Sequence, residues 1–450
     1  MLAYMRSRVP IVLPLLVALH IACAIAATTD DAANALDARA AQDGAKDSTS
    51  SVTASNLVLD FSSSAGPPVG VYTLSQIETA RRHPGAPAVI AQRRLWIDRN
   101  LKRIFVDKSA DAKRLVQAAL GIAELECLTG DTAYRAVRLS LCRRIAAGWP
   151  MGLDRHNQKF PLLDLCRIAS LTQDARVPLR PVFERALVEI ESPNQTLFGT
   201  SIGNTQWLHY WLLRALGRYD DALHGALHGY GKPESTNYEY WSLPRLLMEA
   251  ADEHGLFNFG GTDIWYWGMT SHPAFVAVGW EIREHLPDEA RRRFDLVYVL
   301  PLRLLGHGGA HPHIGEAVKN PKDYAFFSRW QWTWRSDDDA SRWARARIAA
   351  RDDPLSFDDL TLPPLSESEL KTARENTRAH GNARGEAAPD DRPPIARGNR
   401  RFGERLTFIE EKNQTIVIFG GDGRPLNAGH RSPPDTPKRQ KIQNGRVSPE

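Results

Sequence analysis

The spacing of apolar residues between positions 89 and 347 constrains the fold more than any other feature of the sequence. Apolar residues recur there at intervals of three and four, as on one face of a helix, and Gly, Pro, Asn or Asp interrupts the pattern repeatedly. Short connections such as Thr129-Gly130-Asp131 suit tight antiparallel helix pairs. Gly130 can adopt the left-handed backbone that ends a helix, and Asp131 can cap the next one.

This pattern predicts a mainly α fold built as an array of α-hairpins. A helix capped by Ser75, with Glu78 at the capping-box position, precedes the array. The helices expected within the array cover 88–99, 110–128, 131–147, 162–171, 180–190, 204–216, 219–229, 243–253, 273–284, 288–298 and 341–350. No regular sequence period of the kind that standard helical solenoids show is visible, so a closed α/α toroid is favoured over an open solenoid.

Composition shifts divide the chain outside this array. The sequence predicts a small β-hairpin near the C-terminus, because apolar and polar residues alternate on both sides of the turn 410–414. The Gly-, Pro- and Lys-rich residues after it are expected to be disordered, as is the start of the chain. The expected parts are a signal peptide (1–26), a flexible linker (27–70), the α/α helical domain (71–350), a second linker (351–401), the β-hairpin (402–420) and a disordered tail (421–450).

The N-terminus has the features of a secretory signal peptide. Arg6 and Arg8 precede an apolar run, and Ala24-Ile25-Ala26 offers small residues for cleavage. We therefore expect a secreted or periplasmic protein with no stable membrane insertion after cleavage. Of the three cysteines that remain, Cys127 and Cys142 could form a disulfide, or all three could be small buried apolar residues.

The charge balance bears on the partner. The net charge is +4, which would suit an anionic substrate, but the basic residues are spread along the chain and do not indicate nucleic-acid binding. We expect a monomer that needs no cofactor and binds an anionic partner.

Polar and aromatic residues are concentrated between 202 and 272, on segments that otherwise have helical spacing. Helix cores are normally filled by aliphatic residues, so this mixture indicates a ligand cleft, although an aromatic core with satisfied polar tips would give a similar pattern. The residues expected to bind substrate are Gln206, Trp207, His209, Tyr210, Trp211, Arg245, Trp265 and Trp267.

Helical geometry groups some of these residues. Gln206, His209 and Tyr210 share one face of the helix expected over 204–216. Asn204 lies near its N-terminus, where it could hold a substrate carboxylate or simply cap the helix. Arg245 could supply a cation or lie on a solvated helix face.

Candidate proton-transfer groups occur in the same stretch: Tyr238, Tyr240, Tyr266 and His272. Removal of the proton next to a uronate carboxylate requires the negative charge to be neutralised, and then a base and an acid. Tyr and His can fill these two roles when burial or a nearby cation tunes them.

The stretch resembles polysaccharide lyases built on an α/α toroid, of the alginate-lyase and chondroitin-lyase type. Asn204…Trp207…Tyr210-Trp211 is similar to one element of those enzymes, and Asp252-Glu253-His254-Gly255-Leu256-Phe257 followed by Tyr266 and His272 is similar to a second. The resemblance implies that the substrate is an acidic polysaccharide. It also implies that Asn204 neutralises the carboxylate, His272 is a base, and Tyr266 or Tyr240 is the acid.

Other motifs keep alternatives open. His307, His311 and His313 could bind a metal, but a substrate-facing loop is favoured and no metal is predicted. Trp330, Trp332 and Trp334 could form a platform for sugar rings or pack on a core. A glycoside hydrolase would use carboxylates such as Glu239, Asp263 or Asp337, and a non-catalytic envelope protein that binds glycan or protein would need no such groups.

Overall fold

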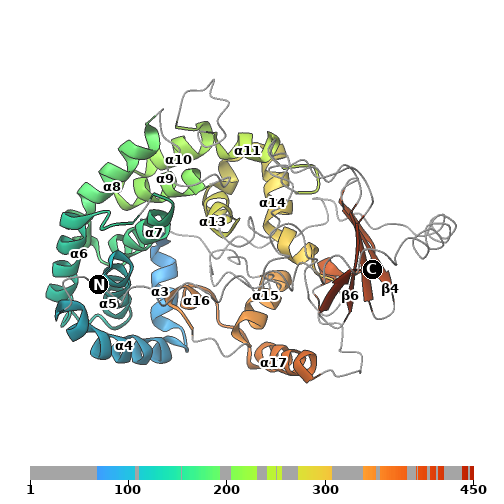
Figure 1. Ribbon diagram of the computed structural model, residues 1–450, viewed down its shortest axis with the longest axis horizontal. Helices are drawn as coiled ribbons and strands as arrows, with labels where there is room; N and C mark the ends of the chain where they lie inside the picture. Colours follow the sequence, from blue (N-terminus) through green and yellow to red (C-terminus); the bar gives the residue numbers. More distant parts are fainter. Residues whose placement is uncertain are drawn as a thin grey trace, which may run out of the picture. The chain divides into compact units, whose positions relative to one another are not determined.

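The computed structural model describes residues 68–106, 111–153, 155–192, 204–230, 241–249, 251–255, 272–306, 338–350, 355–382, 392, 394–402, 406–411, 414–419, 438–443 and 446–449. These residues are mainly helical, as predicted (Figure 1). The predicted signal peptide and most of the predicted linker 27–70 lie outside the described residues.

The α-helices are α3 (Leu74–Arg82), α4 (Ala86–Val106), α5 (Ala112–Thr129), α6 (Arg135–Gly148), α7 (Arg155–Leu171), α8 (Arg176–Glu191), α9 (Asn204–Ala215), α10 (Tyr219–His228), α11 (Leu243–Glu249), α13 (His272–Ile282), α14 (Asp288–Arg303), α15 (Asp339–Ala349), α16 (Phe357–Leu360) and α17 (Glu367–Asn382). Two short strands, β1 (Pro68–Val69) and β2 (Tyr72–Thr73), pair antiparallel before α3.

Prolines explain the errors in the predicted starts of two helices. Helix α7 begins at Arg155 rather than at 162 and contains Pro161, and α8 begins at Arg176 rather than at 180 and contains Pro181. An interior proline removes one backbone hydrogen bond and strains the preceding turn. Burial of the apolar sides of these long helices outweighs that local cost, which sequence spacing alone does not reveal.

The helix caps differ in part from those expected. Thr73, not Ser75, caps α3, and Gln76 completes the capping box. Gly130 ends α5 in the left-handed conformation with φ 70°, as predicted. Asp131 does not cap α6, which begins four residues later; its side chain instead accepts a hydrogen bond from the backbone N–H of Ala133.

Alternate helices of the array contact one another. Helix α3 packs on α5, α5 on α7, α7 on α9, α9 on α13 and α13 on α14. A second set flanks this series, with α6 contacting both α5 and α8, α8 contacting α9, and α10 contacting both α9 and α11. The predicted α-hairpin array is therefore present, and one continuous apolar core runs through it from Val71 to Ala396.

Residues from the two ends of the array meet in one polar cluster. The short helix α16 packs on α3 and α4. The hydroxyl of Tyr72 donates a hydrogen bond to Asp358 (2.7 Å) and accepts one from Arg167 Nε (2.8 Å), while Arg167 also pairs with Asp358 (2.6 Å). A tyrosine near the start of the described chain is thus tied to a carboxylate 286 positions later.

Arg167 holds three carboxylates at once. Besides Asp358 it lies 3.2 Å from Asp164 and 3.5 Å from Glu124, and Glu124 also pairs with Arg93 at 2.5 Å. Burial raises the pKa of Asp164 to about 6 against the opposing effect of Arg167, and it raises the pKa of Glu124 as well. The contribution of this cluster to the free energy of unfolding therefore depends on pH.

A five-stranded antiparallel sheet follows the helices in the order β3 (Arg400–Phe402), β4 (Leu406–Glu411), β5 (Gln414–Phe419), β6 (Lys438–Gln443) and β7 (Arg446–Pro449). The predicted hairpin corresponds to β4 and β5, which pair from Leu406↔Phe419 to Glu411↔Gln414. The sheet is larger than the hairpin, because β6 and β7 fall within 421–450, where the sequence predicts a disordered tail. For residues 351–401 the sequence predicts a linker that includes a polar helix over 367–384; α17 confirms this helix, and α16 is an additional short one.

Specific contacts attach the sheet to α14. The Arg303 guanidinium lies 4.7 Å from the Phe402 ring centroid and donates to the carbonyl of His254 (2.8 Å). Arg400 of β3 donates to the carbonyl of Leu305 (2.8 Å) and pairs with Glu410 of β4 (3.1 Å). These side chains fix β3 and β4 against the end of α14.

Cys127, Cys142 and Cys166 are free and buried. The expectation that they are small buried apolar residues is confirmed, and the alternative disulfide between Cys127 and Cys142 is wrong. Burial raises the pKa of the Cys127 thiol to about 11 and that of Cys142 to about 12. None of the three is a reactive thiolate at neutral pH.

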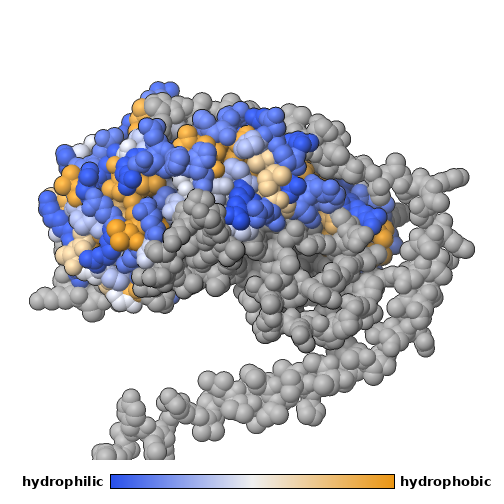
Figure 2. All heavy atoms as spheres, turned by 90° about the horizontal axis from the view of Figure 1, so that it is seen from above, coloured by the Kyte–Doolittle hydropathy of each residue, from blue (hydrophilic) through white to orange (hydrophobic). Residues whose placement is uncertain are grey.

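Hydrophilic residues cover most of the described surface in Figure 2, and hydrophobic ones form small separate patches. Over the whole described surface, the exposed large apolar side chains are Leu74, Leu95, Val177, Val188 and Met248. Within the described part of the chain, no helix combines the length and apolar character needed to cross a bilayer.

We predict that Tyr72→Phe lowers the free energy of unfolding by about 1–3 kcal/mol, because it removes two buried hydrogen bonds to charged groups. Urea denaturation followed by circular dichroism measures the change. Tyr134→Phe is the matched control, since the Tyr134 hydroxyl makes no hydrogen bond within the described residues. Equal stability of the two variants would contradict a stabilising role for Tyr72.

We also predict a pH-dependent effect of Asp164→Asn. The folded-state pKa of Asp164 is raised from 3.8 to about 6, so its stabilising contribution is complete below pH 3.8 and is lost as pH rises through 6. The asparagine does not titrate. Relative to wild type, the variant should therefore gain about 1 kcal/mol of unfolding free energy between pH 5 and pH 8. Asp98→Asn, at an exposed position of α4, is the control.

Candidate functional site

Helix α9 carries most of the polar-aromatic residues identified in the sequence. It contacts α7, α8, α10 and α13, so its side chains meet other helices on several sides. All six residues from Gln206 to Trp211 are buried. The polar members of the set must therefore find partners within the protein or face an internal space.

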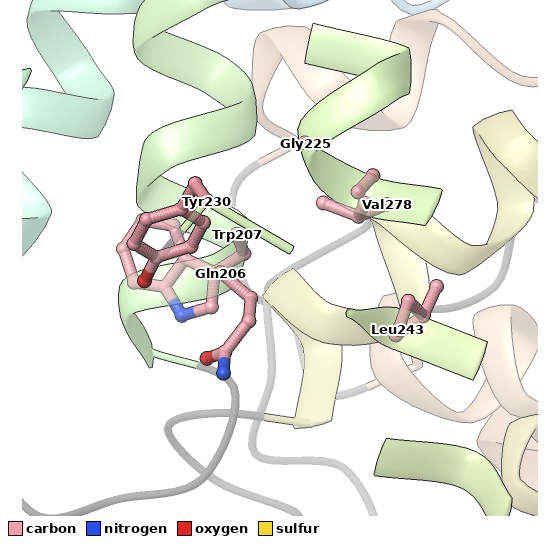
Figure 3. A pocket seen from close by; sticks show the side chains of 7 residues that line it. Gln206, Trp207, Gly225, Tyr230, Leu243 and Val278 are labelled. Atoms are coloured by element: carbon pink, nitrogen blue, oxygen red, sulfur yellow. The ribbon is translucent and has the colours of Figure 1, made fainter. Parts of the chain in front are cut away.

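Gln206 and Trp207 line a small pocket where α9, α10, α11 and α13 meet. Its empty space is about 280 Å³ including the opening to solvent, whereas the part that the centre of a water molecule can occupy is about 10 Å³, enough for one water. In Figure 3, Gln206, Trp207 and Tyr230 stand opposite Val278 and Leu243. The pocket is lined by Gln206, Trp207, Gly225, Ala226, Tyr230, Leu243 and Val278.

The position of each lining residue along its helix shows which parts of the helices meet at the pocket. Gln206 is the third residue of α9 and Val278 the seventh of α13. Asn204 and His272, two of the predicted catalytic residues, are the first residues of the same helices. The pocket therefore lies near the beginning of α9, which starts at Asn204, whereas Val278 is past the middle of α13 and about 9 Å along the helix axis from His272.

The Trp207 ring also connects the pocket to α7. It stacks on Phe160 with ring centroids 6.4 Å apart and an interplanar angle of 22°. Phe160 is the sixth residue of α7, so α7 and α9 lie side by side with their N-terminal ends together. The beginnings of α7 and α9 thus lie together at one end of the array.

His209 forms a second contact at the pocket. Its Nε2 lies 3.0 Å from Glu191 Oε1, and its ring stacks on Tyr230 with centroids 4.0 Å apart and an angle of 14°. The hydrogen bond with His209 is the main cause of the lowered pKa of Glu191. His209 therefore holds Tyr230 in place on the pocket wall.

Tyr210 and Trp211, predicted to bind substrate, lie in the core and do not line the pocket. The Tyr210 hydroxyl accepts a hydrogen bond from Arg214 (2.7 Å), and Arg214 pairs with Glu281 of α13 (3.5 Å). The Arg214 guanidinium also lies 5.6 Å from the Trp211 ring centroid. These residues fix α9 against α13.

Arg245, on α11, is half-buried and engaged with neighbours. Its guanidinium lies 4.0 Å from the Trp241 ring centroid, and Nε donates to Glu249 at 2.8 Å. Arg245 is therefore not simply a solvated side chain. Its charge is partly offset by Glu249.

The remaining candidates fall outside what the structure describes: Tyr238, Glu239, Tyr240, Asp263, Trp265, Tyr266, Trp267, His307, His311, His313, Trp330, Trp332, Trp334 and Asp337. The side chains of Asn204 and His272 are also outside the description. Among the described residues, no group of three or more His, Cys, Asp or Glu side chains could hold a metal ion.

Several pocket residues were missed in the sequence. Gly225 and Tyr230 show no local signal, because their role comes from contacts of α10 and its C-terminal end with α9. Phe160 was missed because the predicted helix began after Pro161. A search for aromatic residues at the beginnings of alternate helices could have found it.

Comparison with known proteins gives no family assignment. No protein-family model matches the chain, and no curated protein has a matching sequence.

We predict that Gly225→Ala distorts the pocket. A Cβ atom at this position would lie 2.9 Å from His209 Cε1, so the imidazole would have to move away from Glu191 or Tyr230. We expect a net loss of about 1 kcal/mol in unfolding free energy, despite the better helix propensity of alanine. Thermal unfolding measures the change.

Gly121→Ala is the matched control for this variant. The added Cβ in α5 would meet only Arg93 Cδ, at 3.8 Å. We expect a gain of about 0.5–1 kcal/mol from helix propensity. Equal stabilisation in both variants would show that His209 is not held tightly.

Proposed function

We propose that the protein is an exported enzyme that cleaves an acidic, uronate-containing polysaccharide by β-elimination. The observation that carries the proposal is the pocket lined by Gln206 and Trp207 near the beginning of α9, the helix that starts at Asn204, with α13, the helix that starts at His272, on its other side. The Gln206 amide can bind polar groups of a sugar, and the buried Trp207 indole forms the wall beside it.

The proposal includes an α/α toroid. Its support is the unbroken series of contacts from α3 through α14, together with those that join the last helices to the first. Helix α14 contacts α15, and α16 packs on α3. Burial and the charge of Arg345 on α15 lower the pKa of His83, which directly follows α3. Such a series would bring the beginnings of alternate helices around one common end.

The proposed reaction breaks the C4–O bond and removes the proton next to the carboxylate. The amides of Asn204 and Gln206 bind the uronate carboxylate and stabilise the negative charge that develops when the neighbouring proton leaves. His272 takes that proton as the base. The electron pair forms the C4–C5 double bond as the C4–O bond breaks, and Tyr266 or Tyr240 gives a proton to the departing oxygen. The products are a chain with an unsaturated uronate and a chain with a free hydroxyl.

Charge and location agree with such a substrate. The net charge of +4 favours an anionic polymer. Arg245 over Trp241 offers a cation beside an aromatic ring, a pairing that suits an acidic sugar. Export from the cytoplasm, as Arg6, Arg8 and the apolar run after them predict, would bring the enzyme to polymeric substrates.

The test is an elimination assay on alginate, hyaluronan, chondroitin and heparan, followed by the ultraviolet absorbance of the new double bond. We predict that absorbance rises on at least one polymer. Asn204→Ala and His272→Ala should each reduce the rate about a hundredfold or more, as expected when a charge-stabilising or proton-transfer group is lost.

His285→Ala is the control, because His285 is exposed in the short helix after α13. New reducing ends without the absorbance change would contradict elimination and indicate a hydrolase. No product on any of the polymers, with folded protein, would favour a glycan- or protein-binding role.

A further inference from the structure

Lys159 is a buried cation with no anionic partner among the described residues. It is 1% exposed and lies in the second turn of α7. Its ammonium nitrogen lies 5.1 Å from the centroid of the Phe160 ring. Several other buried cations pair with a carboxylate: Arg138 with Glu126, Arg167 with Asp358 and Arg214 with Glu281.

Such a side chain is costly for the fold. Moving an ammonium out of water without a counter-ion is strongly unfavourable, and contact with an aromatic ring offsets only part of that cost. Burial lowers the pKa of Lys159 to about 8, so the amine is still mostly protonated at neutral pH. A bound anion would remove most of this cost.

The lysine lies next to the candidate site. Phe160, which the ammonium contacts, stacks on Trp207, and Trp207 lines the pocket with Gln206. A cation, two stacked aromatic rings and an amide therefore follow one another across the beginnings of α7 and α9. Acidic sugars combine an apolar ring face, hydroxyl groups and a carboxylate, and this sequence of groups matches them.

We propose that Lys159 binds an acidic group of the polysaccharide at the Phe160–Trp207 end of the pocket and so contributes to the choice of uronate substrates. This inference rests on the proposed function. It assigns Lys159 to substrate binding, separate from the proton-transfer groups. Hydrogen bonding to a charged partner would make the lysine worth about tenfold or more in affinity.

Binding is tested apart from catalysis. Calorimetry would compare tetrasaccharides of alginate and hyaluronan with their carboxyl-reduced, neutral forms. Lys159→Met should weaken binding of an acidic tetrasaccharide about tenfold or more and leave the neutral form unaffected. Lys159→Arg should restore part of the affinity, and exposed Lys113→Met should change nothing.

A second measurement uses the wild-type protein and does not depend on how the variants fold. Lysines are acetylated with limiting acetic anhydride at pH 8 and quantified by mass spectrometry. The acidic tetrasaccharide should slow acetylation of Lys159 and leave Lys113 unaffected, whereas the carboxyl-reduced form should protect neither.

The outcomes separate this inference from the proposed function. Lys159-dependent binding of acidic tetrasaccharides without any elimination would support the inference and contradict the lyase. Elimination that is unchanged in Lys159→Met, with equal affinity for acidic sugar, would overturn the inference alone. Failure of both acidic tetrasaccharides to bind wild-type protein or protect Lys159 would also overturn it.

Discussion

The contacts of the Arg167 guanidinium hold the two ends of the helical array together. It contacts Tyr72 before α3, Glu124 in α5 and Asp358 in α16, so it links parts of the chain that no local structure could bring together. Buried ion clusters of this kind add little net free energy, because desolvation offsets attraction. They favour one arrangement of the chain, because a misplaced end of the array would leave buried charges without partners.

The same architecture explains why the pocket combines residues distant in sequence. In a hairpin array, alternate helices run in the same direction, and those that contact each other bring their beginnings together. Phe160 and Trp207 therefore come close although they belong to different helices, and Val278 of α13 completes the pocket from the other side.

Much of the helical array could be predicted from the sequence, because apolar spacing and glycine caps act locally. Gln206 and Trp207 were identified for the same reason, as polar-aromatic residues on a helix. Contacts across helices were not accessible: the sequence alone does not show that His209 meets Glu191 or that Tyr230 meets His209. Strand β6, Lys-Arg-Gln-Lys-Ile-Gln, lacks apolar alternation, and its pairing with β5 is made through the backbone.

The three buried cysteines would matter for a protein exported from the cytoplasm, as proposed above. A chain with free thiols can link to another molecule in an oxidising compartment while it is unfolded. Cys127, Cys142 and Cys166 lie in consecutive helices of the core, so folding removes all three from oxidants together. Selection would then act on the speed of folding as well as on final stability, and any thiol that reacts would mark a molecule whose array has opened.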